Sequence, residues 1–378
     1  MRNMAAGAVQ YTNDTDLVLK FQSVKFGNMS LVELQSLLEI KDKQIYQLTK
    51  ELQEAKKEIE HNAKNIFSEE LPTPKPFPCQ YKMPKTLHLM TQSDKTESLC
   101  LSTSRLESFF VTGGADLTIK KWSSTGRKLL ELPGSEKVVL SVDVSPNEQF
   151  ILGSSADKVA RLWSSVSGKL LHWLQGHLDS IFVGKFLNHS KVITGSGDRT
   201  LKIWDIEKSI CLRTTNCFHS CSDLSTATDP DHNTYISAHS DNEIRFWDTR
   251  NSDCLWTSAG LHSKRLTSVC VSPSHTLLLT SSRDNTLKLL DLRTRAALFE
   301  FSRPTYENPA NWSRACFSPD GRYVAAGSGN GCVMLWDAKT GEYEDSLLSE
   351  KSSPFVSVSW TTESLIAIDR SGFVSLWN

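Results

Sequence analysis

The chain has 378 residues, of which 39% are hydrophobic and 22% charged, enough for one large globular domain with an appended segment. A formal net charge of −1 excludes bulk electrostatic attraction to nucleic acid or to anionic membranes. No apolar run approaches the ~20 residues that span a bilayer. No hydrophobic stretch typical of a signal peptide follows the N-terminus.

Residues 1–66 contain two different patterns. Residues 1–30 are polar and aperiodic, which predicts disorder. From residue 31 apolar residues recur at spacings of three and four, and this heptad pattern predicts a coiled coil over residues 31–66. The predicted dimer seam consists of Leu31, Leu34, Leu38, Ile45, Leu48, Leu52 and Ile59. The pattern favours a parallel homodimer, and the alternative is a single amphipathic helix that packs on a partner or on the rest of the chain.

Residues 67–85 contain five of the 13 prolines in the chain. Such a composition favours an extended, semi-rigid spacer, and we interpret this segment as a proline-rich linker. The alternative is that its Pro-Thr-Pro-Lys-Pro stretch binds an aromatic-lined groove of a partner.

From residue 86 onward the chain consists of seven similar segments. Each contains a turn of small residues, a polar residue and a short alternating run that ends on a tryptophan or, once, on leucine. These final residues lie 41 to 46 positions apart and are Trp122, Trp163, Trp204, Trp247, Leu290, Trp336 and Trp377. This period is typical of WD repeats and predicts an all-β fold, a seven-bladed WD40 β-propeller over residues 86–378.

Internal spacing within the segments is constant as well. A polar residue stands six positions before each tryptophan or its leucine replacement: Asp116, Asp157, Asp198, Asp241, Asp284, Asn330 and Ser371. A four-stranded sheet is too small to bury both faces alone, so we expect the seven sheets to stack radially. The run Thr86 to Thr91 has strand character and is expected to complete the seventh blade and close the ring.

Three histidines recur at the same distance from an aspartate. His177, His219 and His262 stand 21 or 22 residues before the aspartate of their segment, and we expect each to join it in a hydrogen-bonding network with a nearby Ser or Thr. Serine, histidine and aspartate also suggest a hydrolase, but here the set recurs with the repeat. We therefore predict blade architecture and no catalytic residues.

Nine cysteines are spaced irregularly, which predicts free thiols in a reducing compartment. The tightest cluster places Cys217 and Cys221 around His219, but no second ligand pair lies at the spacing of a zinc site. No metal and no cofactor are expected.

Whole segments resemble the propeller of the animal autophagy-related protein 16 family. The resemblance is strongest from Gly176, from Ser281 and from Asn311, and it includes the missing tryptophan at Leu290 and the long Trp312-bearing segment before the sixth blade. It covers residues 80–378, whereas residues 31–66 resemble the family only in being a coiled coil. The family's basic N-terminal helix has no convincing match in residues 1–30, and its long middle stretch is reduced to about 19 residues here.

The resemblance implies a non-enzymatic scaffold of autophagy. It implies a homodimer that carries the conjugate of autophagy-related proteins 12 and 5 and directs the attachment of autophagy protein 8 to phosphatidylethanolamine. It also implies a propeller that binds membrane or cargo proteins. The expected localisation is cytoplasmic, with peripheral recruitment to phagophore or endolysosomal membranes.

Other functions have weaker support in the sequence. The stretch Trp247 to Arg250 resembles the WDxR signature of substrate receptors of cullin-type ubiquitin ligases, which is the alternative function. An enzyme lacks support because we find no phosphate-binding loop or nucleophile motif outside the repeats. Nucleic-acid binding lacks a contiguous basic run.

Candidate partner-docking residues follow from repeat geometry. Turns before each aspartate and loops leading into each inner strand gather on one face of a propeller. On the fourth and fifth blades these positions hold His239, Ser240, Arg265 and Arg283.

Overall fold

The computed structural model describes residues 47, 50, 84–92, 96–104, 106, 108–226, 233–258, 260–349 and 352–378. Residues 1–30 and every residue of the predicted coiled-coil seam lie outside this set. Within the predicted coiled coil, Gln47 and Lys50 are described, and both are helical and exposed. Among the described residues, no helix combines the length and the apolar character that crossing a membrane requires.

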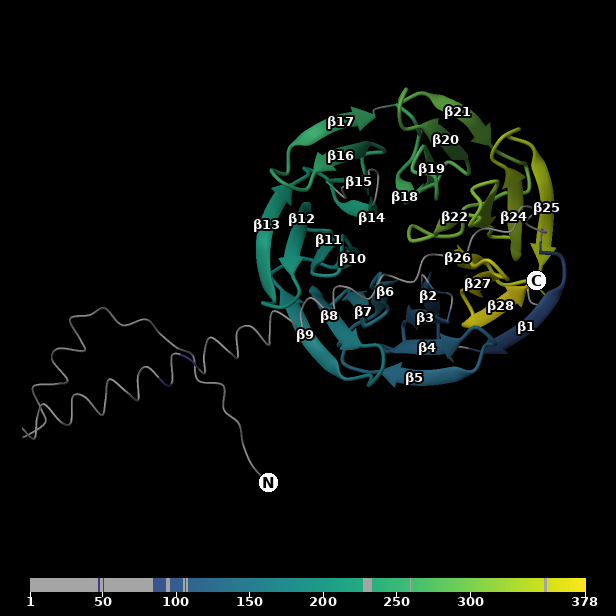
Figure 1. The fold of residues 1–378 in the computed structure, drawn as a ribbon. Coiled ribbons are helices and arrows are strands. Elements are labelled where there is room, and N and C mark those ends of the chain that lie inside the picture. Colours follow the sequence, from purple (N-terminus) through teal and green to yellow (C-terminus); the bar gives the residue numbers. More distant parts are fainter. Residues whose placement is uncertain are drawn as a thin grey trace, which may run out of the picture. The chain divides into compact units, whose positions relative to one another are not determined.

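The strands form seven four-stranded antiparallel sheets arranged as the blades of a ring (Figure 1). Blades one to four contain β2 (Ser98–Thr103), β3 (Phe109–Gly114), β4 (Ile119–Ser123) and β5 (Lys128–Leu132); β6 (Val139–Val144), β7 (Phe150–Ser155), β8 (Val159–Ser164) and β9 (Leu170–Gln175); β10 (Ile181–Phe186), β11 (Lys191–Ser196), β12 (Thr200–Asp205) and β13 (Ile210–Asn216); and β14 (Cys221–Thr226), β15 (Thr234–His239), β16 (Ile244–Asp248) and β17 (Cys254–Ser258). Blades five to seven contain β18 (Leu266–Val271), β19 (Leu277–Ser282), β20 (Leu287–Asp291) and β21 (Ala297–Phe301); β22 (Ala315–Phe317), β23 (Tyr323–Gly327), β24 (Cys332–Asp337) and β25 (Tyr343–Leu348); and β26 (Phe355–Trp360), β27 (Leu365–Asp369), β28 (Phe373–Trp377) and β1 (Leu87–Gln92). The predicted seven-bladed propeller is confirmed.

Blade seven takes its outer strand from the other end of the repeat region. Strand β1 pairs antiparallel with β28, and the main-chain nitrogens of Lys85 and Thr86 donate to the carbonyl of Asn378 at 3.1 and 3.2 Å. The predicted closure is therefore confirmed. Strand β1 gives β28 a paired neighbour on its second edge, so blade seven has four strands like the other blades.

Hydrophobic side chains fill the spaces between adjacent blades. One cluster joins Val111 and Ile119 of blade one to Ile151 and Trp163 of blade two, and all four are buried. Similar clusters join the later blades, and Trp204, Trp336 and Trp377 are also among the largest fully buried side chains. Because each tryptophan packs between blades, the 41 to 46 residue period is the length of chain that forms one blade and reaches the same position in the next.

In blade three, His177 belongs to a completed hydrogen-bonding network. Its Nδ1 lies 2.7 Å from Asp198 Oδ2, and its Nε2 lies 2.7 Å from the hydroxyl of Thr194. That hydroxyl also accepts from the indole of Trp204 at 2.8 Å. Burial lowers the pKa of His177 and outweighs the opposing effect of Asp198, which favours the neutral form of the ring.

Blade five repeats this network as far as its sequence allows. His262 Nδ1 lies 3.0 Å from Asp284 Oδ2, and its Nε2 lies 2.9 Å from the hydroxyl of Thr280. The network ends there because Leu290, in the tryptophan position, has no N–H group to donate.

In blade four the prediction for His219 is wrong. Its ring is 52% exposed and lies 3.7 Å from Asp241, whereas His239 Nε2 lies 2.6 Å from the hydroxyl of Ser237. That hydroxyl accepts from Trp247 at 2.7 Å, as the threonine does in blade three. His239 lies two residues after Ser237 on β15, on the same face of the strand, and so takes the place of the loop histidine.

Candidate functional site

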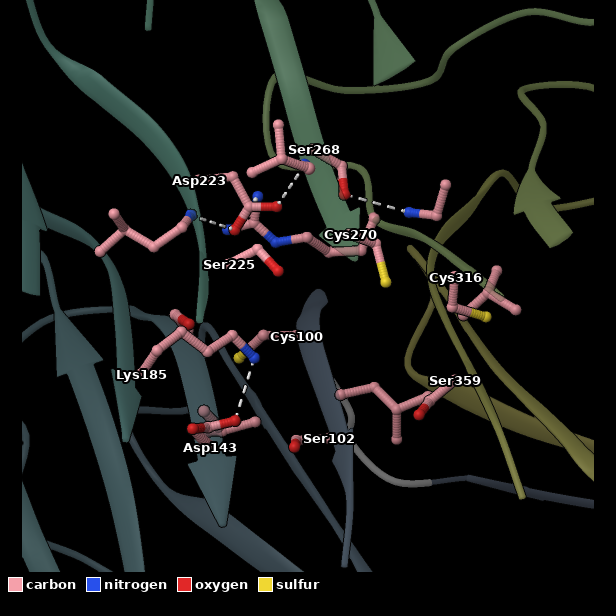
Figure 2. A pocket seen from close by; sticks show the side chains of 18 of the residues that line it. Cys100, Ser102, Asp143, Lys185, Asp223, Ser225, Ser268, Cys270, Cys316 and Ser359 are labelled. Carbon is pink, nitrogen blue, oxygen red and sulfur yellow. Dashed lines mark hydrogen bonds and ion pairs between the residues drawn. The ribbon is translucent and has the colours of Figure 1, made fainter. Parts of the chain in front are cut away.

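The innermost strands of the seven blades lie around the centre of the ring (Figure 1), and the space that their side chains enclose there is called the central channel below. It contains a cavity of about 280 Å³ whose walls include residues of β2, β6, β10, β14, β18, β22 and β26. Figure 2 shows this cavity and the polar side chains around it. Because every blade contributes to it, the channel exists only when the ring is closed.

One register position recurs in all seven inner strands. In blade two it is Asp143, which pairs with Leu152 of β7. Leu152 directly follows Ile151, the residue that pairs with Trp163. The equivalent residues are Ser102, Asp143, Lys185, Ser225, Cys270, Cys316 and Ser359. All seven line the cavity, so the repeat offers one side chain per blade to the channel.

Two of these seven side chains accept hydrogen bonds from the backbone of the next blade. Asp143 Oδ2 accepts a hydrogen bond from the main-chain nitrogen of Phe186 at 2.9 Å. The hydroxyl of Ser225 accepts one from the main-chain nitrogen of Val271 at 3.2 Å. One pleat earlier, Asp223 Oδ2 accepts from Val269 at 2.9 Å. An inner strand has no ladder partner on its channel edge, so these oxygen atoms satisfy N–H groups that the sheet leaves open.

Two ion pairs lie in the same walls. Lys185 Nζ lies 2.9 Å from Asp143 Oδ1, and Arg314 Nη1 lies 3.2 Å from Asp223 Oδ1. Burial lowers the pKa of Lys185, but Asp143 and Asp223 together outweigh burial and hold it above its ordinary value. The lysine therefore stays charged, and each pair joins residues of different blades.

The channel wall also contains cysteine thiols, which are poorly suited to act as nucleophiles or metal ligands. Burial raises the pKa of Cys100 to about 12 and that of Cys270 to about 11, and it raises the pKa of Cys316 well above its ordinary value. Protonated thiols are weak nucleophiles and weak metal ligands. In the described part of the chain, no group of three or more His, Cys, Asp or Glu side chains is placed to hold a metal ion.

Two of the four candidate docking residues come from β15 and its turn. His239 is fully buried in the blade-four network, so its side chain offers no surface to a partner. Ser240 follows it in the turn, is partly exposed, and accepts a hydrogen bond from Ser220 at 2.9 Å.

The other two candidates lie together in blade five. Arg265 and Arg283 are both partly exposed, and the main-chain nitrogen of Arg283 donates to the carbonyl of Arg265 at 3.0 Å. Burial lowers the pKa of Arg265, and the positive charge of Arg283 lowers it further. The structure thus brings Arg265 and Arg283 into one electrostatic cluster.

Arg314, which the repeat pattern did not mark as a docking residue, also belongs to this cluster. Arg265 Nη2 donates to the hydroxyl of Ser222 at 3.2 Å, and Arg314 Nη1 donates to the carbonyl of Ser222 at 3.3 Å. The only sequence signal was the Trp312-Ser313-Arg314 stretch, which marked the family resemblance but not a position in space.

Comparisons with known proteins agree with this architecture. A family model described as WD domain, G-beta repeat matches residues 126–164, 168–205, 254–291 and 306–337. The chain is 43% identical to Autophagy-related protein 16 of Arabidopsis thaliana over 70 residues, which are 18% of this chain and 14% of that protein. It is 35% identical to Protein tipD of Dictyostelium discoideum over 267 residues, 70% of this chain and 44% of that protein.

A third relative is Protein Atg16l2 of Mus musculus, 35% identical over 80 residues, which are 21% of this chain and 13% of that protein. The chain therefore matches less than half the length of each of these three relatives. The resemblance predicted from the sequence is confirmed: this chain is similar to proteins of the autophagy-related protein 16 type, and it carries a WD-repeat propeller.

Proposed function

We propose that this chain is a non-enzymatic scaffold of autophagy whose propeller docks other proteins. The observation that carries the proposal is the match to Autophagy-related protein 16 of Arabidopsis thaliana in a chain whose repeats form a closed ring. The histidine–aspartate sets of blades three and five support it, because their hydrogen bonds run to side chains of their own blade.

The scaffold binds the conjugate of autophagy-related proteins 12 and 5 and brings it to membranes for attachment of autophagy protein 8 to phosphatidylethanolamine. Residues 31–66 form a homodimer in this proposal. Ser240, Arg265 and Arg283 contact a membrane or cargo protein. The chain is cytoplasmic and is recruited peripherally to phagophore or endolysosomal membranes.

A titration of purified full-length protein with the purified 12–5 conjugate tests the scaffold role. We expect saturable binding at one conjugate per chain. The matched control lacks residues 1–66 and is expected to lose binding while circular dichroism shows a folded propeller. Absence of binding by folded full-length protein would contradict recruitment of the conjugate and leave the propeller acting apart from it.

A substrate receptor of a cullin-type ubiquitin ligase is the second candidate. One observation favours it: the side chain of Arg250, in the WDxR-like stretch, is 71% exposed although it pairs with Asp248 at 2.7 Å. Arg250→Ala is then expected to abolish co-purification with the ligase adaptor. If wild-type protein fails to co-purify with the adaptor, this candidate is excluded.

A further inference from the structure

Three arginines gather at one end of the central channel. Arg265 directly precedes inner strand β18, Arg283 begins the turn between β19 and β20, and Arg314 directly precedes inner strand β22. Antiparallel connectivity places all three at the end of the blades where inner strands begin. Ser222, near the start of β14, receives hydrogen bonds from both Arg265 and Arg314.

Positive charge exceeds negative charge in this cluster. Among the described residues, Asp223 is the carboxylate that pairs with one of these guanidinium groups, and it pairs with Arg314 at 3.2 Å. Arg265 and Arg283 make their hydrogen bonds to neutral oxygens, the hydroxyl of Ser222 and the carbonyl of Asn308. Of the three guanidinium groups, one is therefore paired with a carboxylate and two are hydrogen-bonded to neutral oxygens.

Two buried N–H groups of the cluster lack an acceptor. Arg265 Nε and Arg314 Nη2 are buried nitrogen atoms without a hydrogen-bond partner in the described part of the chain. An unsatisfied buried donor is costly, and more so when it is charged. An oxyanion that enters between these side chains would supply both the missing acceptors and the missing negative charge.

We propose that Arg265, Arg283 and Arg314 form a binding site for a carboxylate side chain of an acidic segment in a partner protein. The planar guanidinium group presents paired donors that match the two oxygens of a carboxylate. The site rests on the proposed docking function and deepens it, because it names the chemistry that the docked partner presents. The side chain of Arg314 is 15% exposed, and its pair with Asp223 fixes its position.

Fluorescence anisotropy with full-length protein tests the site. The probes are a fluorescein-labelled peptide of eight glutamates and the matching glutamine peptide. We expect the glutamate peptide to bind and the glutamine peptide not to bind. Arg265→Gln and Arg283→Gln are each expected to weaken glutamate-peptide binding about tenfold, since each removes a charge-assisted hydrogen bond.

Arg293→Gln is the matched control. Arg293 lies in the turn after β20, at the opposite end of the same blade, and its side chain is 78% exposed. The Arg293→Gln variant should bind the glutamate peptide with the same affinity as the wild type. Equal weakening by all three variants would overturn the site, because it would show nonspecific attraction.

Isothermal titration calorimetry with inositol hexakisphosphate alone, beside the glutamate-peptide titration, separates carboxylate from phosphate ligands. Binding of the phosphate probe together with no binding of the glutamate peptide would overturn the carboxylate assignment. Thermal melts of each variant show that the ring is folded. The peptide assay contains no 12–5 conjugate, so its failure is distinct from failure of the scaffold proposal.

Discussion

Thr194 joins two hydrogen-bonding side chains of blade three through one hydroxyl. It lies 2.7 Å from His177 Nε2 and accepts from Trp204 at 2.8 Å. In blade five, Thr280 has no tryptophan partner; its hydroxyl lies 2.9 Å from His262 Nε2 and donates to the carbonyl of Lys288 at 3.2 Å. Valine has nearly the shape of threonine but no hydroxyl. We expect Thr194→Val to lower the free energy of unfolding by about 2–4 kcal/mol and Thr280→Val by about 1–2 kcal/mol. Urea unfolding measures both, and equal losses would show that the indole hydrogen bond of Trp204 contributes no more than the hydrogen bond of Thr280 to the carbonyl of Lys288.

His239 makes the free energy of unfolding of the propeller depend on pH. Burial, followed by the charge of Arg245, lowers its folded pKa to about 4, whereas an unfolded histidine titrates near 6.5. Between pH 6.5 and pH 4, His239 is therefore protonated in the unfolded chain but not in the folded chain. We expect the free energy of unfolding to fall as pH drops from 6.5 to 4, by a total on the order of 3 kcal/mol.

Replacement of His239 by glutamine isolates this contribution, because glutamine keeps a polar contact for Ser237 and does not titrate. Urea unfolding between pH 7 and pH 4.5 compares the two proteins. The wild type should lose more stability over this range than His239→Gln. Parallel pH profiles would mean that His239 titrates alike in the folded and unfolded chain.

At the scale of elements, the sequence predicted what depends on local spacing. Each blade was predictable because its polar turn residue, its strand and its tryptophan or leucine lie within one short segment. The outer strand of blade seven was predictable because β28 needed a second partner. The sequence did not show that His239, and not His219, is the network histidine of blade four. Both lie near Asp241, and only the path of the backbone places His239 beside Ser237. Arg314 was missed for a related reason: its contacts with Ser222 and Asp223 span about 90 residues.

At the scale of the whole molecule, bonds between neighbouring inner strands hold the ring together around a polar channel. Asp143 shows how two functions combine in one side chain. Its Oδ1 pairs with Lys185 and its Oδ2 accepts from the main chain of Phe186, both in the next blade. Loss of this side chain leaves a charge and a main-chain donor without partners at one junction.

Three variants at this junction separate the two contributions. Asp143→Ala removes both contacts and is expected to lower the free energy of unfolding by about 2–3 kcal/mol, less than the ~3–5 kcal/mol typical of a fully buried ion pair, because the side chain of Lys185 is 31% exposed. Asp143→Asn keeps an acceptor for Phe186 and should cost less. Lys185→Met added to Asp143→Ala removes the unpaired ammonium and should restore part of the loss. Calorimetric melts of the three proteins decide the matter: if the double variant is no more stable than Asp143→Ala, the unpaired charge of Lys185 is not what weakens the ring, and the open N–H of Phe186 carries the cost.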